Sequence, residues 1–318
     1  MPNSPVLTLV APSRALVVQG TMDAVDSVRL ARIEKALANL GWSVREAQNI
    51  HFVDKRFAGS DNVRARALEK ALTDKNSDLA LSLRGGYGAS RLLPLLDWNL
   101  LCGPTVPLAG FSDVTALFLA FLTQLGKGGW LAPCANAFDM QCDARDAAFR
   151  HAFQSQDFHL TVEATSGAYQ NPDTFAAKGL IWGGNLSVLV SLLGTPYFPS
   201  VQGGILFLED VAEPAYRIER AFLQLAYAGV LTSQSAVVLG HFTGSERGAG
   251  IGAGHFGLCD AVDFIRRNLK VPVLTGFPIG HVPACVTIPT GVVGTVALSG
   301  GTWTLTADVA SILPHCAP

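Results

Sequence analysis

The spacing of apolar and polar residues along the first 125 positions predicts strands that alternate with helices. Short apolar runs are typical of buried strands, whereas apolar positions repeated every three or four residues are typical of helices. The predicted strands are residues 6–10, 42–47, 79–83 and 106–110, and the predicted helices are residues 23–40, a segment from Ser60-Asp61 through Leu72, residues 89–96 and residues 112–125. This alternation favours a parallel sheet covered on both faces.

The second half of the chain is richer in strand signals. Between residues 154 and 175 the pattern weakens, and Gly167, Asn171 and Pro172 indicate a linker. The elements predicted after it are strands at residues 178–182, 204–208 and 236–239, a helix at residues 218–225, and a β-hairpin of residues 292–298 and 302–307 around Gly300-Gly301.

These patterns predict an α/β fold in two parts. We expect an N-terminal domain at residues 1–155 with a parallel, flavodoxin-like or Rossmann-like sheet, a linker at residues 156–175, and a smaller, β-rich α/β C-terminal domain at residues 176–318. A chain of 318 residues is long enough for two such domains.

The composition narrows the classes of function. Hydrophobic residues make up 49% of the chain and charged residues only 15%, below the usual value of about 25%, so a large core can form. The net charge of −2 and the absence of Lys/Arg blocks argue against a nucleic-acid partner. The longest apolar stretch, residues 114–122, is shorter than the ~20 residues of a membrane span, and the N-terminus lacks a signal-peptide pattern. We therefore expect a soluble cytoplasmic protein without a membrane partner.

The cysteines and histidines do not have the spacing of a metal site. None of the six cysteines forms a C-x-x-C pair, so we expect reduced thiols and no metal. Residues 252–257 match G-x-G-x-x-G, but they do not directly follow a strand. We interpret residues 244–257 as a glycine-rich surface loop, and we expect no cofactor.

Ser112 has the setting of a catalytic serine. An apolar strand ends at Gly110, and Ser112 stands before a helical run. Such a turn can present a serine hydroxyl at the carboxyl edge of a parallel sheet, where the next N–H, that of Asp113, could stabilise an oxyanion. The alternative is that Ser112 only caps the helix.

The segment Leu83-Arg-Gly-Gly-Tyr-Gly88 is a candidate anion site. Its glycines allow the backbone N–H groups to converge, and Arg84 adds a charge that can hold a carboxylate. If this loop lies beside Ser112, it can supply a second oxyanion donor. The alternative is an ordinary turn between a strand and a helix.

Acids and histidines in the second half complete the candidate chemistry. Glu209, Asp210 and Glu213 follow an apolar strand and could orient a histidine. His281 lies in a loop constrained by glycine and proline, which suits a general base, and His241 is its rival. Solvent-exposed acids and an exposed loop histidine are the alternatives.

The ordered set of segments resembles the LD-carboxypeptidase (muramoyltetrapeptide carboxypeptidase) family of serine peptidases, which is related to the microcin C immunity peptidases. The resemblance rests on Leu83-Arg-Gly-Gly-Tyr-Gly88, Leu95-Leu-Asp-Trp98, Gly110-Phe-Ser-Asp113, Ile181-Trp-Gly-Gly-Asn-Leu186, Leu208-Glu-Asp-Val211, Tyr216-Arg-Ile-Glu-Arg220 and Gly280-His281. These segments occur in the order of the family and span most of the chain. The sequence departs from the family at Cys285, which stands where the family usually has an asparagine.

The resemblance implies the roles of the site residues. Ser112 would be the nucleophile in the N-terminal domain, and His281 and Glu209 would be the base and the orienting acid in the C-terminal domain. The N–H groups of Gly86 and Asp113 would form the oxyanion hole. The substrate-binding residues would be Arg84, Trp182 and Asn185.

The implied reaction is hydrolysis of the L,D bond before the terminal D-Ala of a murein tetrapeptide, as in peptidoglycan recycling. The partner would be this small peptide, and the resemblance implies a homodimer. Two alternatives stay open. One is a microcin-immunity-type peptidase that cleaves peptidyl or aminoacyl nucleotides, and the other is a non-catalytic protein that binds a small ligand.

Overall fold

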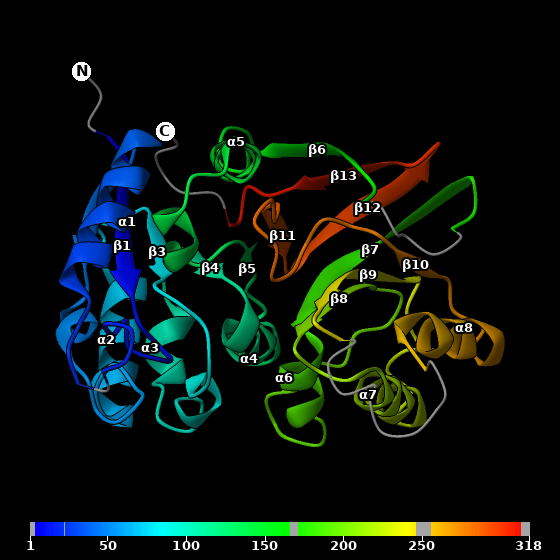
Figure 1. Cartoon of the computed structure of the whole chain (residues 1–318), viewed down its shortest axis with the longest axis horizontal. Helices are drawn as coiled ribbons and strands as arrows, with labels where there is room; N and C mark the ends of the chain where they lie inside the picture. The colour runs from blue at the N-terminus through cyan, green and yellow to red at the C-terminus, as the bar shows by residue number, and fades with distance from the viewer. Residues whose placement is uncertain (1–3, 22, 166–170, 246–255, 313–318) are drawn as a thin grey trace.

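The computed structural model describes residues 4–21, 23–165, 171–245 and 256–312, and it contains two sheets (Figure 1). The first sheet has the strand order β11-β5-β4-β3-β1-β2. Its strands are β1 (Val6–Val10), β2 (Ser43–Glu46), β3 (Leu79–Ser82), β4 (Leu108–Gly110), β5 (Gly129–Leu131) and β11 (Ile288–Thr290). All neighbours are parallel except β11, which is antiparallel to β5.

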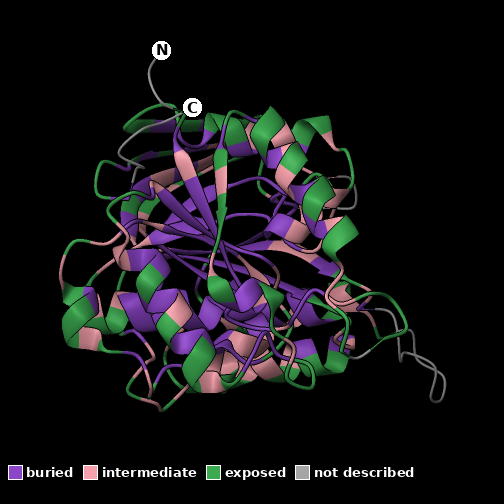
Figure 2. Cartoon of the chain, turned by 90° about the vertical axis from the view of Figure 1, so that its left-hand side faces the viewer, coloured by how far each residue is buried: buried purple, intermediate pink, exposed green. Residues whose placement is uncertain are grey.

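Helices cover this sheet and bury their apolar faces against it. The α-helices are α1 (Ser27–Asn39), α2 (Asp61–Thr73), α3 (Trp98–Cys102), α4 (Thr115–Leu125) and α5 (Asp143–His151), and the 3₁₀ helices are η1 (Gln48–His51), η2 (Ala89–Arg91), η3 (Ser112–Val114) and η4 (Ala135–Asp139). Ser60 caps α2 by accepting a hydrogen bond from the N–H of Val63, as its position in the sequence predicts. The strands are buried at the centre of the view in Figure 2, whereas the surrounding helices expose their outer faces.

The second sheet combines parallel and antiparallel strands in the order β10-β9-β8-β7-β12-β13-β6. Its strands are β6 (Asp157–Glu163), β7 (Thr174–Asn185), β8 (Ile205–Val211), β9 (Ala236–Thr243), β10 (Val273–Thr275), β12 (Val292–Ser299) and β13 (Thr302–Asp308). Strands β7 to β10 are parallel, and β12, β13 and β6 extend the sheet as antiparallel strands. The helices of this half are α6 (Leu186–Ser191), α7 (Ala215–Tyr227) and α8 (Leu258–Asn268).

The two halves are joined by backbone and side-chain contacts. Strand β11 comes from the C-terminal half of the chain but pairs with β5 in the first sheet. The indole N–H of Trp130 donates to the carbonyl of Ile312 at 2.8 Å. The backbone N–H of Asn185, at the end of β7, donates to Thr115 Oγ1 at the start of α4 at 2.9 Å. These contacts fix the carboxyl end of β4 relative to that of β8.

The predicted α/β fold class is confirmed, and two predicted segments are wrong. Residues 89–96 were expected to be a helix, but only the short η2 forms, because Pro94 cannot donate a helical hydrogen bond. Residues 157–163, expected in a linker, form β6, which pairs with β13 along its whole length. The predicted hairpin is confirmed as β12 and β13.

Three further expectations concern membrane-spanning helices, the cysteines and the glycine-rich loop. No helix of the described residues is both long enough and apolar enough to cross a membrane. The five cysteines in the described part of the chain are free. Most of the glycine-rich loop predicted at residues 244–257 lies outside the described residues.

Candidate active site

Ser112 lies at a sharp turn between β4 and α4. Its φ is +63°, in the left-handed region that non-glycine residues rarely adopt and that costs about 1–2 kcal/mol. The N-cap residues of η3 and α4 are Phe111 and Val114, so Ser112 caps neither helix. Its side chain is partly exposed. A strained turn that points a serine hydroxyl outward is the geometry of a nucleophile elbow.

The loop after β3 lies directly against this turn. A Cβ placed on Gly85 would be 2.8 Å from Ser112 Cβ and 2.9 Å from Ser112 Oγ, so only glycine fits there without a shift. Gly86 follows with a φ of +124°. The N–H groups of Gly86 and Asp113 have no backbone acceptor among the described residues. The condition set by the sequence, a glycine-rich loop beside Ser112, is therefore met.

His281 links Ser112 to a buried acid. His281 Nε2 lies 3.2 Å from Ser112 Oγ, and His281 Nδ1 lies 2.8 Å from Glu209 Oε2. The imidazole also packs against the Phe111 ring at 4.7 Å between ring centres. Gly280 lets this loop lie close to the acid, because a Cβ there would be 3.0 Å from the His241 carbonyl oxygen and 3.3 Å from Glu209 Cβ. Ser112, His281 and Glu209, called the triad below, thus form one hydrogen-bonded chain.

Glu209 lies at an irregular position of β8. The register between β8 and β9 shifts between Leu208 and Asp210. Residues 205–210 are all buried, because β8 is a central strand covered on both faces, and an irregularity of this kind often redirects side chains near active sites. Glu209 and Asp210 are each only 3% exposed.

Two opposing effects act on the pKa of Glu209. Burial raises the pKa of this carboxyl above its usual value, while the hydrogen bond with His281 opposes that rise. Oε1 is buried and has no hydrogen-bond partner among the described residues. Cys285, which stands where the resembled family has an asparagine, is buried nearby, and burial raises the pKa of its thiol to about 12. It is therefore a neutral thiol at physiological pH.

The rival acids and the rival histidine have other contacts. Asp210 accepts hydrogen bonds from the side-chain amide of Asn185 at 2.9 Å and from the Ser187 hydroxyl at 2.7 Å. Glu213 pairs with Arg217 on α7 at 2.5 Å. No hydrogen bond among the described residues joins His241 to Ser112 or to an acid. Glu209 and His281 are therefore the pair that faces the serine.

The three residues predicted to bind substrate differ in availability. Arg84 is half-buried, and its Nε has no partner in the described part of the chain. Trp182 is 1% exposed and its indole N–H donates to Gln234 at 2.9 Å. Asn185 is 4% exposed, with its amide on Asp210 and its oxygen accepting from the N–H of Val188. The side chains of Trp182 and Asn185 are thus engaged inside the protein, and Arg84 alone has an unused donor.

The carboxylate of Asp113 holds two loops around Ser112, a role that the sequence reasoning did not identify. Asp113 Oδ2 accepts hydrogen bonds from the Ser13 hydroxyl at 2.5 Å and from the N–H of Ala89 at 2.9 Å. Burial raises the pKa of this carboxyl, and both hydrogen bonds lower it. The glycine-rich loop and the segment after β1 are thereby tied to the serine turn.

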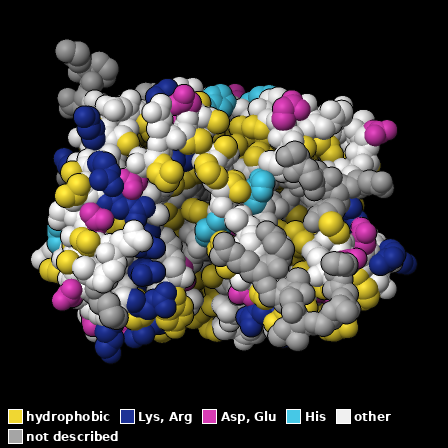
Figure 3. Space-filling view, in the orientation of Figure 1, with side chains coloured by type: hydrophobic (Ala, Val, Ile, Leu, Met, Phe, Trp, Pro, Cys, Tyr) yellow, Lys and Arg dark blue, Asp and Glu magenta, His cyan; other side chains and the backbone are white. Residues whose placement is uncertain are grey.

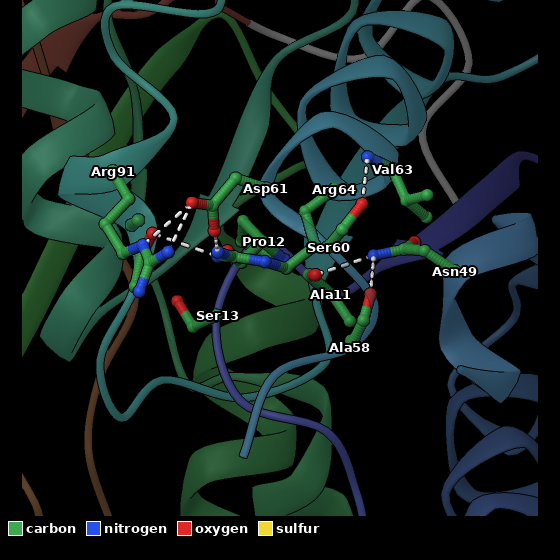
Figure 4. Close-up of polar contacts among 12 residues, drawn as sticks. Ala11, Pro12, Ser13, Asn49, Ala58, Ser60, Asp61, Val63, Arg64 and Arg91 are labelled. Atoms are coloured by element: carbon green, nitrogen blue, oxygen red, sulfur yellow. Dashed lines mark hydrogen bonds and ion pairs between the residues drawn. The ribbon is translucent and has the colours of Figure 1, made fainter. Parts of the chain in front are cut away.

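A buried arginine reinforces the same loops. Arg64 Nη1 donates to the carbonyls of Pro12 at 2.5 Å and Gly88 at 2.9 Å. Arg64 Nη2 pairs with Asp61, which also forms an ion pair with Arg91 (Figure 4). The available sequence signal was an arginine on the apolar face of a predicted helix. A fully buried arginine needs such partners, because an unpaired buried charge is costly.

A serine, a histidine and an acid linked in this way at a strand-to-helix turn are the arrangement of hydrolases with a serine nucleophile. Comparison with known proteins identifies the family to which the chain belongs. The LD-carboxypeptidase N-terminal domain family matches residues 7–132, and the LD-carboxypeptidase C-terminal domain family matches residues 178–296. The chain belongs to the LD-carboxypeptidase family of peptidases.

Individual relatives agree with this assignment. A protein from Streptomyces coelicolor is 34% identical over 280 residues, which is 83% of this chain and 85% of that protein. The murein tetrapeptide carboxypeptidase of Pseudomonas aeruginosa is 33% identical over 60% of this chain and 64% of its own length. The crystal structure of muramoyltetrapeptide carboxypeptidase from Oxalobacter formigenes matches with a TM-score of 0.80 at 30% identity, covering 95% of this chain and 98% of that one.

The fold is also shared with more distant proteins. An MccF-like protein from Bacillus anthracis covers 99% of this chain and 98% of its own, with a TM-score of 0.81 at 22% identity. At this identity the similarity concerns the fold.

Proposed function

We propose that the protein is a serine LD-carboxypeptidase that removes the terminal D-Ala from a murein tetrapeptide. The observation that carries this proposal is the hydrogen-bonded chain from Ser112 Oγ through His281 to Glu209. Relatives named murein tetrapeptide carboxypeptidase and muramoyltetrapeptide carboxypeptidase support the choice of substrate.

The first half of the reaction forms an acyl-enzyme. His281 Nε2 accepts the proton of Ser112 Oγ, and Oγ attacks the carbonyl carbon of the bond before D-Ala. The N–H groups of Gly86 and Asp113 hold the negative oxygen of the tetrahedral intermediate. Protonated His281 then gives its proton to the leaving amine of D-Ala. Glu209 stabilises the imidazolium and keeps Nε2 directed at the serine.

The second half releases the shortened peptide. Water enters after D-Ala leaves, His281 takes its proton, and the hydroxide attacks the acyl carbon. The Ser112 oxygen leaves and recovers its proton from His281. All of these steps use side chains and backbone groups of the chain itself.

Arg84 suits the recognition that a carboxypeptidase needs. Such an enzyme must bind the free carboxylate at the end of its substrate, and a guanidinium can hold a carboxylate with two hydrogen bonds. Arg84 Nε is buried without a partner among the described residues, and Arg84 adjoins Gly85, which packs on Ser112. We assign the terminal carboxylate to Arg84. A cytoplasmic location, a role in peptidoglycan recycling and a homodimer are part of the same proposal.

The test is a comparison of two substrates by mass spectrometry. The protein is incubated with L-Ala-γ-D-Glu-meso-diaminopimelate-D-Ala and, separately, with an aminoacyl sulfamoyl adenosine. We expect loss of D-Ala from the peptide and an intact nucleotide. Cleavage of the nucleotide alone would favour the microcin-immunity-type activity. Turnover of neither compound would favour a ligand-binding protein.

A further inference from the structure

Three arginine side chains from separate segments surround the loop that carries Gly86. Arg84 immediately precedes the paired glycines, and Arg14, after β1, has its Cβ 3.1 Å from the position of a Cβ on Gly86. The guanidinium carbon of Arg56 lies 5.5 Å from the centre of the Tyr87 ring. Gly85 packs on Ser112, so these arginines border a loop that contacts the proposed nucleophile.

No acidic side chain among the described residues forms an ion pair with any of the three. Other arginines of this half are neutralised, for example Arg29 by Asp139 and Arg64 by Asp61. Figure 3 shows that Lys and Arg side chains gather over the N-terminal half of the face, beside the hollow between the two halves. Within the described residues, no ion pair therefore neutralises these three arginines.

Arg84 has donor groups that the described residues leave largely unused. Its Nε is buried without a partner in the described part of the structure, and its Nη1 makes one long hydrogen bond, 3.5 Å, to the carbonyl of Ala15. Burial lowers the pKa of Arg84, and the charges of Arg14, Arg29 and Arg56 lower it further. A guanidinium stays protonated in spite of such shifts, so Arg84 offers a charged donor that an anion can use.

We propose that Arg14 and Arg56 extend the Arg84 site into an anion-binding subsite that holds a second carboxylate of the peptide substrate. This inference rests on the proposed function and goes beyond it by naming what selects the substrate. A murein tetrapeptide carries carboxylates on D-Glu and diaminopimelate besides that of the terminal D-Ala. With the terminal group on Arg84, the subsite assigns an internal carboxylate to the two remaining arginines.

The experiment measures kcat and KM for D-Ala release from three peptides. The first is L-Ala-γ-D-Glu-meso-diaminopimelate-D-Ala. The second has L-Lys in place of diaminopimelate, and the third has D-isoglutamine in place of D-Glu, so each lacks one internal carboxylate. The proteins are the wild type, Arg14→Gln, Arg56→Gln and the control Arg150→Gln, an exposed arginine on α5.

We expect Arg14→Gln and Arg56→Gln each to raise KM for the first peptide about tenfold, the loss of one charged hydrogen bond, with kcat within about twofold. One of the two neutralised peptides shows a raised KM with the wild type and is affected less by these substitutions. Arg150→Gln leaves all values unchanged. Equal effects on all three peptides, or no effect on KM, would overturn the subsite while leaving the proposed function intact. If the wild type releases D-Ala from none of the peptides, the proposed function fails, and the subsite fails with it.

Discussion

The backbone N–H of Asn185 donates a hydrogen bond to Thr115 Oγ1 at 2.9 Å, across the boundary between the two sheets. Asn185 is the register partner of Glu209 in the pairing of β7 with β8. Thr115 begins α4, three residues after Ser112. This hydrogen bond therefore connects β7, the strand that pairs with the strand of the acid, to the helix that follows the serine, and it helps to set the spacing that His281 must bridge.

Replacing Thr115 with valine should loosen this spacing. The N–H of Asn185 would remain buried without an acceptor, which costs about 1–3 kcal/mol. We expect kcat to fall about tenfold, because small displacements of reacting groups are costly. Urea unfolding and D-Ala release measure the two effects. Thr73→Val, which removes a hydroxyl at the end of α2, is the control for a general loss of stability. An unchanged kcat in Thr115→Val would contradict the positioning role.

Glu209 and Glu213 should differ sharply in importance. Glu209→Gln removes the negative charge that stabilises the imidazolium and can turn an NH2 group toward His281 Nδ1, which favours the wrong tautomer, so it should lower kcat by about 10³- to 10⁴-fold. Glu213 pairs with Arg217 on α7, so Glu213→Gln should change kcat by less than about twofold. Steady-state kinetics give kcat for the two variants. A larger loss of kcat in Glu213→Gln than in Glu209→Gln would transfer the role of the acid to Glu213.

Gly85 should tolerate no side chain. A Cβ there would lie 2.9 Å from Ser112 Oγ and would displace either the serine or the oxyanion loop. We expect Gly85→Ala to lower kcat by at least about tenfold. Gly257→Ala is the matched control, because a Cβ at that position has no neighbour closer than 4.0 Å. If the two variants had equal activity, the close packing of this loop on Ser112 would not matter for catalysis.

Asp113 should make the protein less stable as the pH rises. Burial raises its pKa in the folded state above the unfolded value of about 3.9, so its favourable contribution is complete below that value and is lost as the pH rises through the folded pKa. The variant Asp113→Asn has no titrating group at this position. The free energy of unfolding of the wild type minus that of Asp113→Asn should therefore decrease between pH 4 and pH 7 in urea titrations. An increase over this range would contradict the raised pKa.

Local sequence patterns were sufficient for β1 to β4 of the first sheet, and the family resemblance then chose the triad among the candidates. Strand β1 and the capped helix α2 are formed by residues whose apolar spacing and capping serine are visible in the sequence. Ser112, Glu209 and His281 each follow a strand or a glycine, and the family motifs named them. Their hydrogen bonds in the structure agree with that choice.

The features that the sequence did not predict depend on contacts between segments far apart in the chain. Strand β6 forms because β13 pairs with it, and β11 crosses to the first sheet to pair with β5. The irregular register at Glu209 arises in the pairing of β8 with β9. The hydrogen bonds of Asp113 to Ser13 and Ala89 also span segments far apart in the chain, so no local pattern could have predicted them.

The most direct test of this account is the rate of D-Ala release by Ser112→Ala beside the wild type. The peptide is L-Ala-γ-D-Glu-meso-diaminopimelate-D-Ala, D-Ala is quantified by mass spectrometry, and urea unfolding shows that both proteins are folded. We predict D-Ala release by the wild type, a rate lower by on the order of 10⁴-fold or more in Ser112→Ala, and a stability close to that of the wild type, because alanine keeps Cβ and with it the same backbone strain at φ +63°. Full D-Ala release by folded Ser112→Ala would contradict the assignment of Ser112 as the nucleophile.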